Sequence, residues 1–146
     1  MDFDMKVKQA IYRAVVETTR MPTVAEVAGQ MGASPSAVHA AFGRLHERHM
    51  LVLEPDGETI RMAMPFSGVP TEHRVHVDGR SYFANCAWDA LGVPAALHKP
   101  GVVETRCGWS HEPIRLEVGP DGPAPAACVA HFAIPAVHWW KDIVFT

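Results

Sequence analysis

A thiol and a carboxylate, Cys86 and Asp89, are the residue pair in this chain best suited to chemistry. Residues three positions apart lie on one face of a helix, where both side chains can act on the same bound group. A cysteine in the first turn meets free N–H donors and the positive end of the helix dipole, and both favour a thiolate over a thiol. We therefore predict a short helix that begins near Cys86, with Asp89 placed to give a proton to whatever the sulfur holds. Taken alone, the pair also fits an inert buried thiol and a surface carboxylate.

Short strands are expected around this helix. The pair Asp78-Gly79 is typical of a hairpin turn between strands at residues 75–77 and 80–82. The sequence Gly-Val-Pro at residues 92–94 is expected to break the helix, with residues 95–97 as a candidate helical continuation. Apolar patterns predict three further strands, at residues 102–106, 113–118 and 126–134. Residues 75–146 are thus predicted to form a small mixed or antiparallel sheet domain with short helices.

Residues 1–64 have the pattern of a winged helix-turn-helix. A capping-box pair, Thr23 and Glu26, predicts the start of a second helix, and Ser34 followed by Pro35 predicts the start of a third. The remaining elements expected here are a first helix at residues 4–20 and two strands at residues 49–53 and 59–64. A linker rich in proline, glycine and serine is predicted at residues 65–74. The fold class predicted for the whole chain is α+β.

The charge distribution argues against a nucleic-acid partner. The chain has a net charge of -3, and residues 1–64 hold seven Lys or Arg against eight Asp or Glu. Phosphate neutralisation supplies much of the affinity of DNA-binding proteins, so the helix-turn-helix is predicted to pack against the second half instead of binding DNA. No apolar run suits a membrane span, no signal-peptide pattern opens the chain, and three cysteines suit free thiols. We therefore expect a cytoplasmic protein without a membrane partner.

The segment around Cys86 resembles the active-site segment of the organomercurial (alkylmercury) lyases. The resemblance rests on an aromatic pair before a Cys-x-x-Asp helix and a following proline, within residues 80–97. Residues 105–116 are similar to the family's next strand pair. Cys107 lies 21 positions after Cys86 (107 − 86), the spacing of a supporting cysteine in that family. The N-terminal winged-helix half also matches the family's architecture, where it serves the enzyme.

This resemblance implies cleavage of a carbon–mercury bond by protonolysis. Cys86 would capture the mercury of a small organometallic substrate, and Asp89 would deliver the proton to the departing carbon and share in holding the metal. A soft thiolate suits a soft metal on chemical grounds alone, and proton delivery is general acid catalysis. No organic cofactor is expected. Low-molecular-weight thiols are expected to help remove the Hg(II) product.

The family's second catalytic cysteine is expected one position after Thr146, where this sequence ends. Three interpretations stay open: a truncated sequence, a recoded stop codon such as one for selenocysteine, or a family member that has lost the dithiolate and does something else. A chain without the second thiol is expected still to bind organomercurials through Cys86, with cleavage weakened or dependent on added thiol. Cys128 is interpreted as a buried core cysteine on a strand, and Cys107 as structural. Two rival functions are a thiol-based metal- or redox-responsive winged-helix DNA-binding regulator and a non-catalytic soft-metal-binding protein.

The other candidate residues have less specific interpretations. Asn85 is a candidate to orient the backbone of Cys86. The tryptophans are expected to form core or pocket walls, because no basic strip interleaves them: Trp88, Trp109, Trp139 and Trp140. His131 and His138 are interpreted as polar core or surface groups, with a role as metal ligands as the less favoured alternative.

Overall fold

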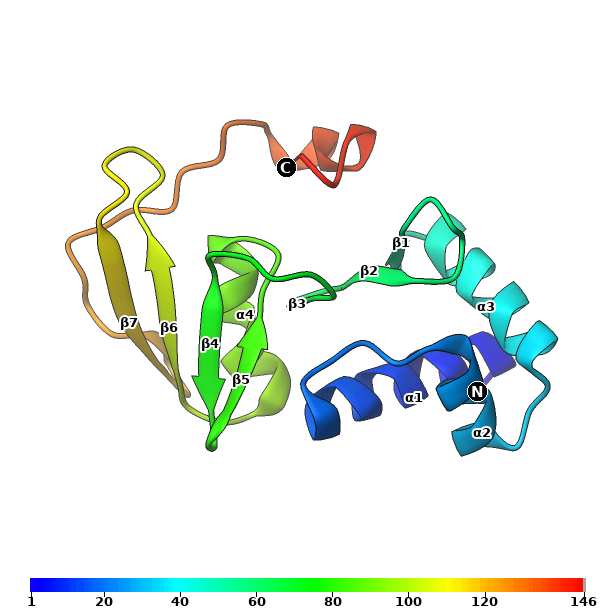
Figure 1. The fold of residues 1–146 in the computed structure, drawn as a ribbon. Coiled ribbons are helices and arrows are strands. Elements are labelled where there is room, and N and C mark those ends of the chain that lie inside the picture. Colours follow the sequence, from blue (N-terminus) through cyan, green and yellow to red (C-terminus); the bar gives the residue numbers. More distant parts are fainter. Residues whose placement is uncertain (146) are drawn as a thin grey trace.

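The computed structural model describes residues 1–145, which form helices and two antiparallel sheets in two adjoining parts (Figure 1). The first part contains α1 (Phe3–Thr18), α2 (Val24–Met31), α3 (Pro35–Glu47), β1 (Val52–Leu53), β2 (Ile60–Ala63) and β3 (Phe66–Ser67). The second contains β4 (Arg74–Val77), β5 (Arg80–Phe83), α4 (Ala87–Leu97), β6 (Gly101–Arg106), β7 (Pro113–Gly119), β8 (Gly122–Pro123) and the 3₁₀-helix η1 (Ala136–Lys141). This mixture of helix and antiparallel sheet confirms the predicted α+β class.

Helices α2 and α3 begin at the predicted capping residues. In α2, the side chain of Thr23 accepts a hydrogen bond from the backbone of Glu26 while the Glu26 carboxylate accepts from the backbone of Thr23, so the capping box is confirmed. In α3, Ser34 is the N-cap and Pro35 occupies the first turn. The apolar faces of these helices, which include Val27 and Phe42, are buried against one another.

The segment predicted to be a linker contains a strand. Phe66 and Ser67 form β3, which pairs with β2 through Ala63 and Met62 and completes a three-stranded sheet in the order β1-β2-β3. Phe66 also forms a bridge to Ala84 at the end of β5. The apolar side chain of Phe66 explains the difference, because burying it requires the backbone to run beside β2.

The second sheet has five antiparallel strands in the order β5-β4-β6-β7-β8. The predicted hairpin is confirmed: β4 and β5 pair from Arg74 with Phe83 to Val77 with Arg80, and both turn residues, Asp78 and Gly79, have positive φ angles of 52° and 76°. Two successive left-handed residues are the geometry of a tight hairpin turn, for which Asp-Gly is favoured. Helix α4 packs on this sheet against β4, β6 and β7.

Helix α4 continues through the position where the sequence predicted a break. Pro94 lies inside the helix, which extends to Leu97 and ends with His98 in the left-handed conformation. A proline removes one helical hydrogen bond, but Pro94 is buried together with Ala90 and Val93 on the face that packs against the sheet. The apolar area buried on this face offsets the lost bond, and the prediction of a break at residues 92–94 was therefore wrong.

One apolar core joins the two parts of the chain. It extends from residues of α1 and α3 through Phe66 to residues of β4, β6 and β7. Phe66 is 2% exposed, and the centroid of its ring lies 6.3 Å from the ring centroid of Tyr12 and 5.4 Å from that of Tyr82. Hydrogen bonds also cross between the parts, from the Arg80 guanidinium (2.6 Å) and the Tyr82 hydroxyl (3.0 Å) to the carbonyl oxygen of Val16.

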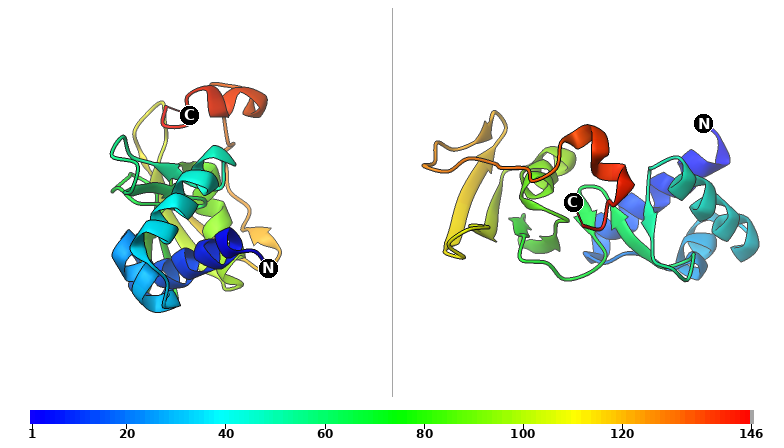
Figure 2. Two further views of the ribbon diagram at one scale, coloured as in Figure 1. Left: turned by 90° about the vertical axis from the view of Figure 1, so that its right-hand side faces the viewer. Right: turned by 90° about the horizontal axis from the view of Figure 1, so that it is seen from above.

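The segment after β8 does not form the predicted strand. Residues 126–134 have no strand in the structure, and Val129 is 91% exposed. Figure 1 and Figure 2 show this segment running from the side of β7 across α4 and towards β1 and β2. Prolines flank the segment and cannot donate to a strand ladder. Phe132 packs against Trp88 and Trp139, and Trp140 stacks on His49 at 4.1 Å. Within residues 1–145, no helix combines the length and apolar character that crossing a bilayer would require.

Candidate functional site

A cavity of about 420 Å³ lies at the N-terminus of α4. Its walls come from the β2–β3 region, from His73, from the start of α4 and from the C-terminal segment. The described lining residues are Met62, Met64, His73, Asn85, Cys86, Ala87, Trp88, Asp89, Ala130, His131, Phe132, Ala133, Ile134, Trp139, Ile143, Val144 and Phe145. Cys86 and Asp89 therefore reach one cavity, as their spacing predicted, and most of the other walls are apolar.

The Cys86 thiol is held at the helix terminus itself. Cys86 is the N-cap of α4 and not a first-turn residue, and its Sγ accepts a hydrogen bond from the backbone N–H of Asp89 at 3.4 Å. Burial raises the pKa of the Cys86 thiol, and the negative charge of Asp89 adds to this effect. The N–H groups of Asp89 and Trp88 act in the opposite direction but are outweighed. The expected lowering of this pKa was wrong, because the sulfur is partly removed from water.

The carboxyl group of Asp89 is half-buried and prefers its protonated form more than an exposed aspartate does. Burial raises the pKa of Asp89, while a hydrogen bond from Asn85 and the charge of His73 lower it by less. The Asn85 Nδ2 group donates to Asp89 Oδ2 at 3.0 Å. A carboxyl group whose pKa is raised holds a proton more often at neutral pH, which suits proton transfer.

Two residues that the sequence did not suggest lie close to this carboxyl group. His73 lines the cavity, and its Nδ1 is 2.7 Å from the Thr105 hydroxyl of β6. Burial lowers the pKa of His73. Tyr12 of α1 donates to the carbonyl oxygen of Met64 at 2.7 Å, and burial together with the charge of Asp89 raises the pKa of Tyr12 to about 12. No spacing in the sequence links these residues to Cys86, because the tertiary fold brings them together.

The other two cysteines lie outside the cavity. Cys107 begins the turn between β6 and β7, and hydrogen bonds from the side chain and backbone of Ser110 lower the pKa of its thiol. Cys128 is exposed on the irregular C-terminal segment, so its interpretation as a buried strand cysteine was wrong. The predicted tryptophan roles are divided: Trp88 and Trp139 line the cavity, whereas Trp109 is 91% exposed.

Histidines and acidic residues do not assemble into a hard-metal site. Among residues 1–145, no group of three or more His, Cys, Asp or Glu side chains could hold a metal ion. His131 lines the cavity but is exposed, which agrees with its predicted interpretation as a surface group. The soft donors near Cys86 are the thioethers of Met62 and Met64, which line the same cavity.

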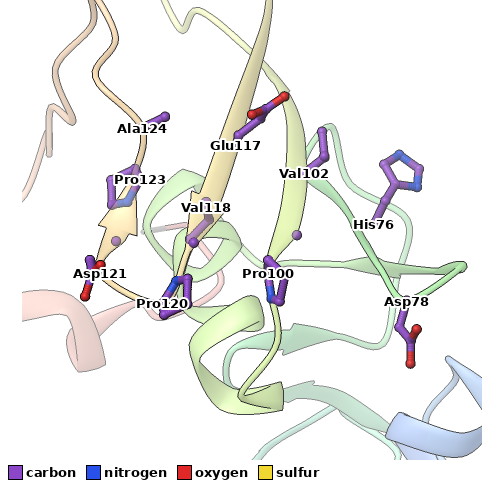
Figure 3. A pocket seen from close by; sticks show the side chains of 13 residues that line it. His76, Asp78, Pro100, Val102, Glu117, Val118, Pro120, Asp121, Pro123 and Ala124 are labelled. Atoms are coloured by element: carbon purple, nitrogen blue, oxygen red, sulfur yellow. The ribbon is translucent and has the colours of Figure 1, made fainter.

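A larger hollow, about 700 Å³, lies elsewhere on the molecule (Figure 3). It is lined by residues of β4, β6, β7, β8 and the adjoining turns, including His76, Asp78, Glu117 and Asp121. Its described lining residues include no cysteine, and His76 is already paired with Glu104 at 3.0 Å. The nucleophile and the carboxyl group predicted from the sequence belong to the smaller cavity.

The site thus places a thiol and a carboxyl group in one cavity with mostly apolar walls. The family model described as MerB, alkylmercury lyase, matches residues 66–146, and the chain belongs to this family.

Individual relatives agree with this assignment. The chain is 36% identical over 95 residues to an alkylmercury lyase of Streptomyces lividans and 33% identical over 96 residues to one of Pseudomonas putida. Each alignment covers 60% of this chain and 44% of the relative, so the chain matches less than half the length of these proteins. A solved structure, the mercury-bound form of MerB2, is similar with a TM-score of 0.69 and 26% identity, over 87% of this chain and 61% of that one.

Proposed function

We propose that this protein cleaves the carbon–mercury bond of a small organomercurial by protonolysis. The observation that supports the proposal most directly is that the Cys86 thiol and the Asp89 carboxyl group line one cavity in a chain of the alkylmercury lyase family. Cys86 is the proposed mercury ligand and nucleophile. Asp89 is the proposed proton donor and second ligand of the product metal.

The reaction begins with ligand exchange at mercury. The Cys86 sulfur displaces the anion X from R–Hg–X and forms an S–Hg bond, while the thiol proton passes to the Asp89 carboxylate. The raised pKa of Asp89 favours its holding this proton. Asp89 then protonates the carbon as the C–Hg bond breaks with its electron pair on carbon. The hydrocarbon R–H leaves, and mercury stays Hg(II), held by the Cys86 sulfur and the Asp89 carboxylate.

Product removal is proposed to use a thiol from solution. Of the three cysteines, only Cys86 is among the described residues that line the cavity. A low-molecular-weight thiol can attack the S–Hg bond and carry Hg(II) away as its thiolate complex. Such thiols are abundant in a reducing cytoplasm, which is the proposed compartment.

The N-terminal part is proposed to be a winged helix-turn-helix that serves this cavity. Its three capped helices and small antiparallel sheet support the assignment. Met62 of β2 and the neighbouring Met64 line the cavity, so this part supplies wall residues to the site. A role in packing explains the absence of a basic surplus in residues 1–64.

The test compares capture with cleavage of phenylmercury in a background carrying Cys107→Ser and Cys128→Ser, both of which lie outside the cavity. Intact mass reports the phenylmercury adduct, and headspace chromatography with added thiol reports benzene. Cys86→Ser should abolish both signals. Asp89→Asn should keep the adduct but slow benzene release by roughly 10²–10⁴-fold, the usual contribution of a general acid.

The matched control is Asp78→Asn, which changes the same residue type at the hairpin turn, on the other hollow (Figure 3). It should release benzene at the background rate. Adduct formation without any benzene release in the background protein would refute the lyase proposal and identify a soft-metal-binding protein instead. Benzene release unaffected by Asp89→Asn would refute the assigned proton donor.

A further inference from the structure

The side-chain amide of Asn85 joins three acceptors next to the cavity. Its Nδ2 group lies 3.0 Å from Asp89 Oδ2, 3.3 Å from the carbonyl oxygen of Phe66 and 3.4 Å from that of Pro65. One amide therefore connects the carboxyl group on α4 with the backbone at the start of β3. The sequence-based interpretation, in which Asn85 orients the backbone of Cys86, does not match these contacts.

The orientation of this amide is determined by its surroundings. Rotating the side chain by 180° would place Oδ1 against two carbonyl oxygens and a carboxyl oxygen, which are all acceptors. In the observed orientation, Asn85 Oδ1 is buried and has no hydrogen-bond partner among residues 1–145. Leaving a buried acceptor unpaired destabilises the folded protein. This cost is offset only if the NH₂ group is needed where it lies.

We propose that Asn85 is the positioning residue of the proton donor, holding Asp89 Oδ2 so that the transferred proton is carried on Oδ1. The inference rests on the proposed function and extends it to a residue next to Cys86 in the chain. A carboxyl oxygen that accepts an N–H bond is the carbonyl-type oxygen of the protonated group, because the hydroxyl oxygen is the weaker acceptor. The donor bond thus fixes both the direction of the carboxyl plane and the oxygen that delivers the proton.

The same amide makes the geometry of the acid depend on the N-terminal part of the chain. The Phe66 carbonyl belongs to β3, which pairs with β2, and the Pro65 carbonyl directly precedes this strand. Tyr12 of α1 donates to the neighbouring carbonyl of Met64. A small displacement of β3 would move Asn85 and, through it, the Asp89 carboxyl group. Reactions of positioned groups are sensitive to displacements of about 1 Å.

The test replaces Asn85 with Leu, which has a similar size and no donor, in the Cys107→Ser/Cys128→Ser background. Capture of phenylmercury, followed by intact mass, should stay within about twofold of the background rate, since Cys86 is unchanged. Benzene release in a single turnover should fall roughly 10–100-fold, part of the usual general-acid contribution. Asn85→Ala removes the same hydrogen bond without adding volume, and it should likewise slow benzene release much more than phenylmercury capture.

The control is Tyr82→Phe, which removes another hydrogen bond between the two parts, to the Val16 carbonyl, and leaves the carboxyl group of Asp89 untouched. Thermal unfolding of each variant shows whether it is folded at the assay temperature. If Asn85 had only a structural role, the Asn85 variants would behave like Tyr82→Phe, and phenylmercury capture and benzene release would be slowed together. Background-rate release by a folded Asn85→Leu or Asn85→Ala variant overturns this inference alone, whereas no release by the background protein overturns the proposed function as well.

Discussion

Replacing Phe66 with alanine tests whether the two parts of the chain share one core. The Phe66 side chain is 2% exposed and lies between the rings of Tyr12 and Tyr82. Truncation of a buried phenylalanine to alanine costs about 3–5 kcal/mol, the sum of the lost transfer free energy and the residual cavity. The rigid aromatic neighbours limit collapse of the cavity, so we expect the upper half of this range.

That loss is large compared with the total free energy of unfolding of a typical domain, about 5–15 kcal/mol. Urea denaturation followed by circular dichroism measures this loss of unfolding free energy directly. The dependence of the unfolding free energy on urea concentration should stay unchanged if unfolding stays two-state. The control is Phe132→Ala. Phe132 is 43% exposed on the C-terminal segment, and its loss should cost about 1 kcal/mol or less.

Two results would contradict the reasoning. A loss of less than about 1.5 kcal/mol for Phe66→Ala would mean that the side chain is not enclosed as the structure shows it. Separate unfolding transitions in the unsubstituted protein would mean that the two parts do not form one cooperative unit.

Two further predictions follow from the pKa shifts. Iodoacetamide should alkylate Cys107 faster than Cys86 at neutral pH, since bonds from Ser110 lower the pKa of Cys107 while burial raises that of Cys86; peptide mass spectrometry measures both rates, and faster reaction of Cys86 would contradict the shifts. Asp89→Asn should stabilise the protein at pH 7. In the folded protein the pKa of Asp89 is raised above its ordinary value of 3.8, so ionisation of this carboxyl group lowers the stability of the native protein as pH rises above 3.8. The stability gained by Asp89→Asn should therefore vanish below pH 3.8. A gain that does not depend on pH in urea titrations would refute the carboxyl group as its origin.

The sequence by itself determined the local elements and the two candidate reacting groups. Helix starts at Thr23 and Ser34 were predictable because a capping side chain bonds to backbone only two or three residues away. The Asp78-Gly79 turn was predictable for the same local reason. The pairing of Cys86 with Asp89 needed only helical spacing and the family resemblance, and both line one cavity.

Only the tertiary structure decided what surrounds those groups and how they ionise. Burial reversed the predicted direction of the Cys86 pKa shift, because desolvation depends on residues distant in sequence. His73 and the Asn85 contact to the Phe66 carbonyl arise from strand pairing and from the β3 bridge, which no local pattern encodes. The apolar run at residues 126–134 looked like a strand, but strand formation depends on tertiary context, and in the assembled fold Phe132 of this run packs against Trp88 and Trp139 instead.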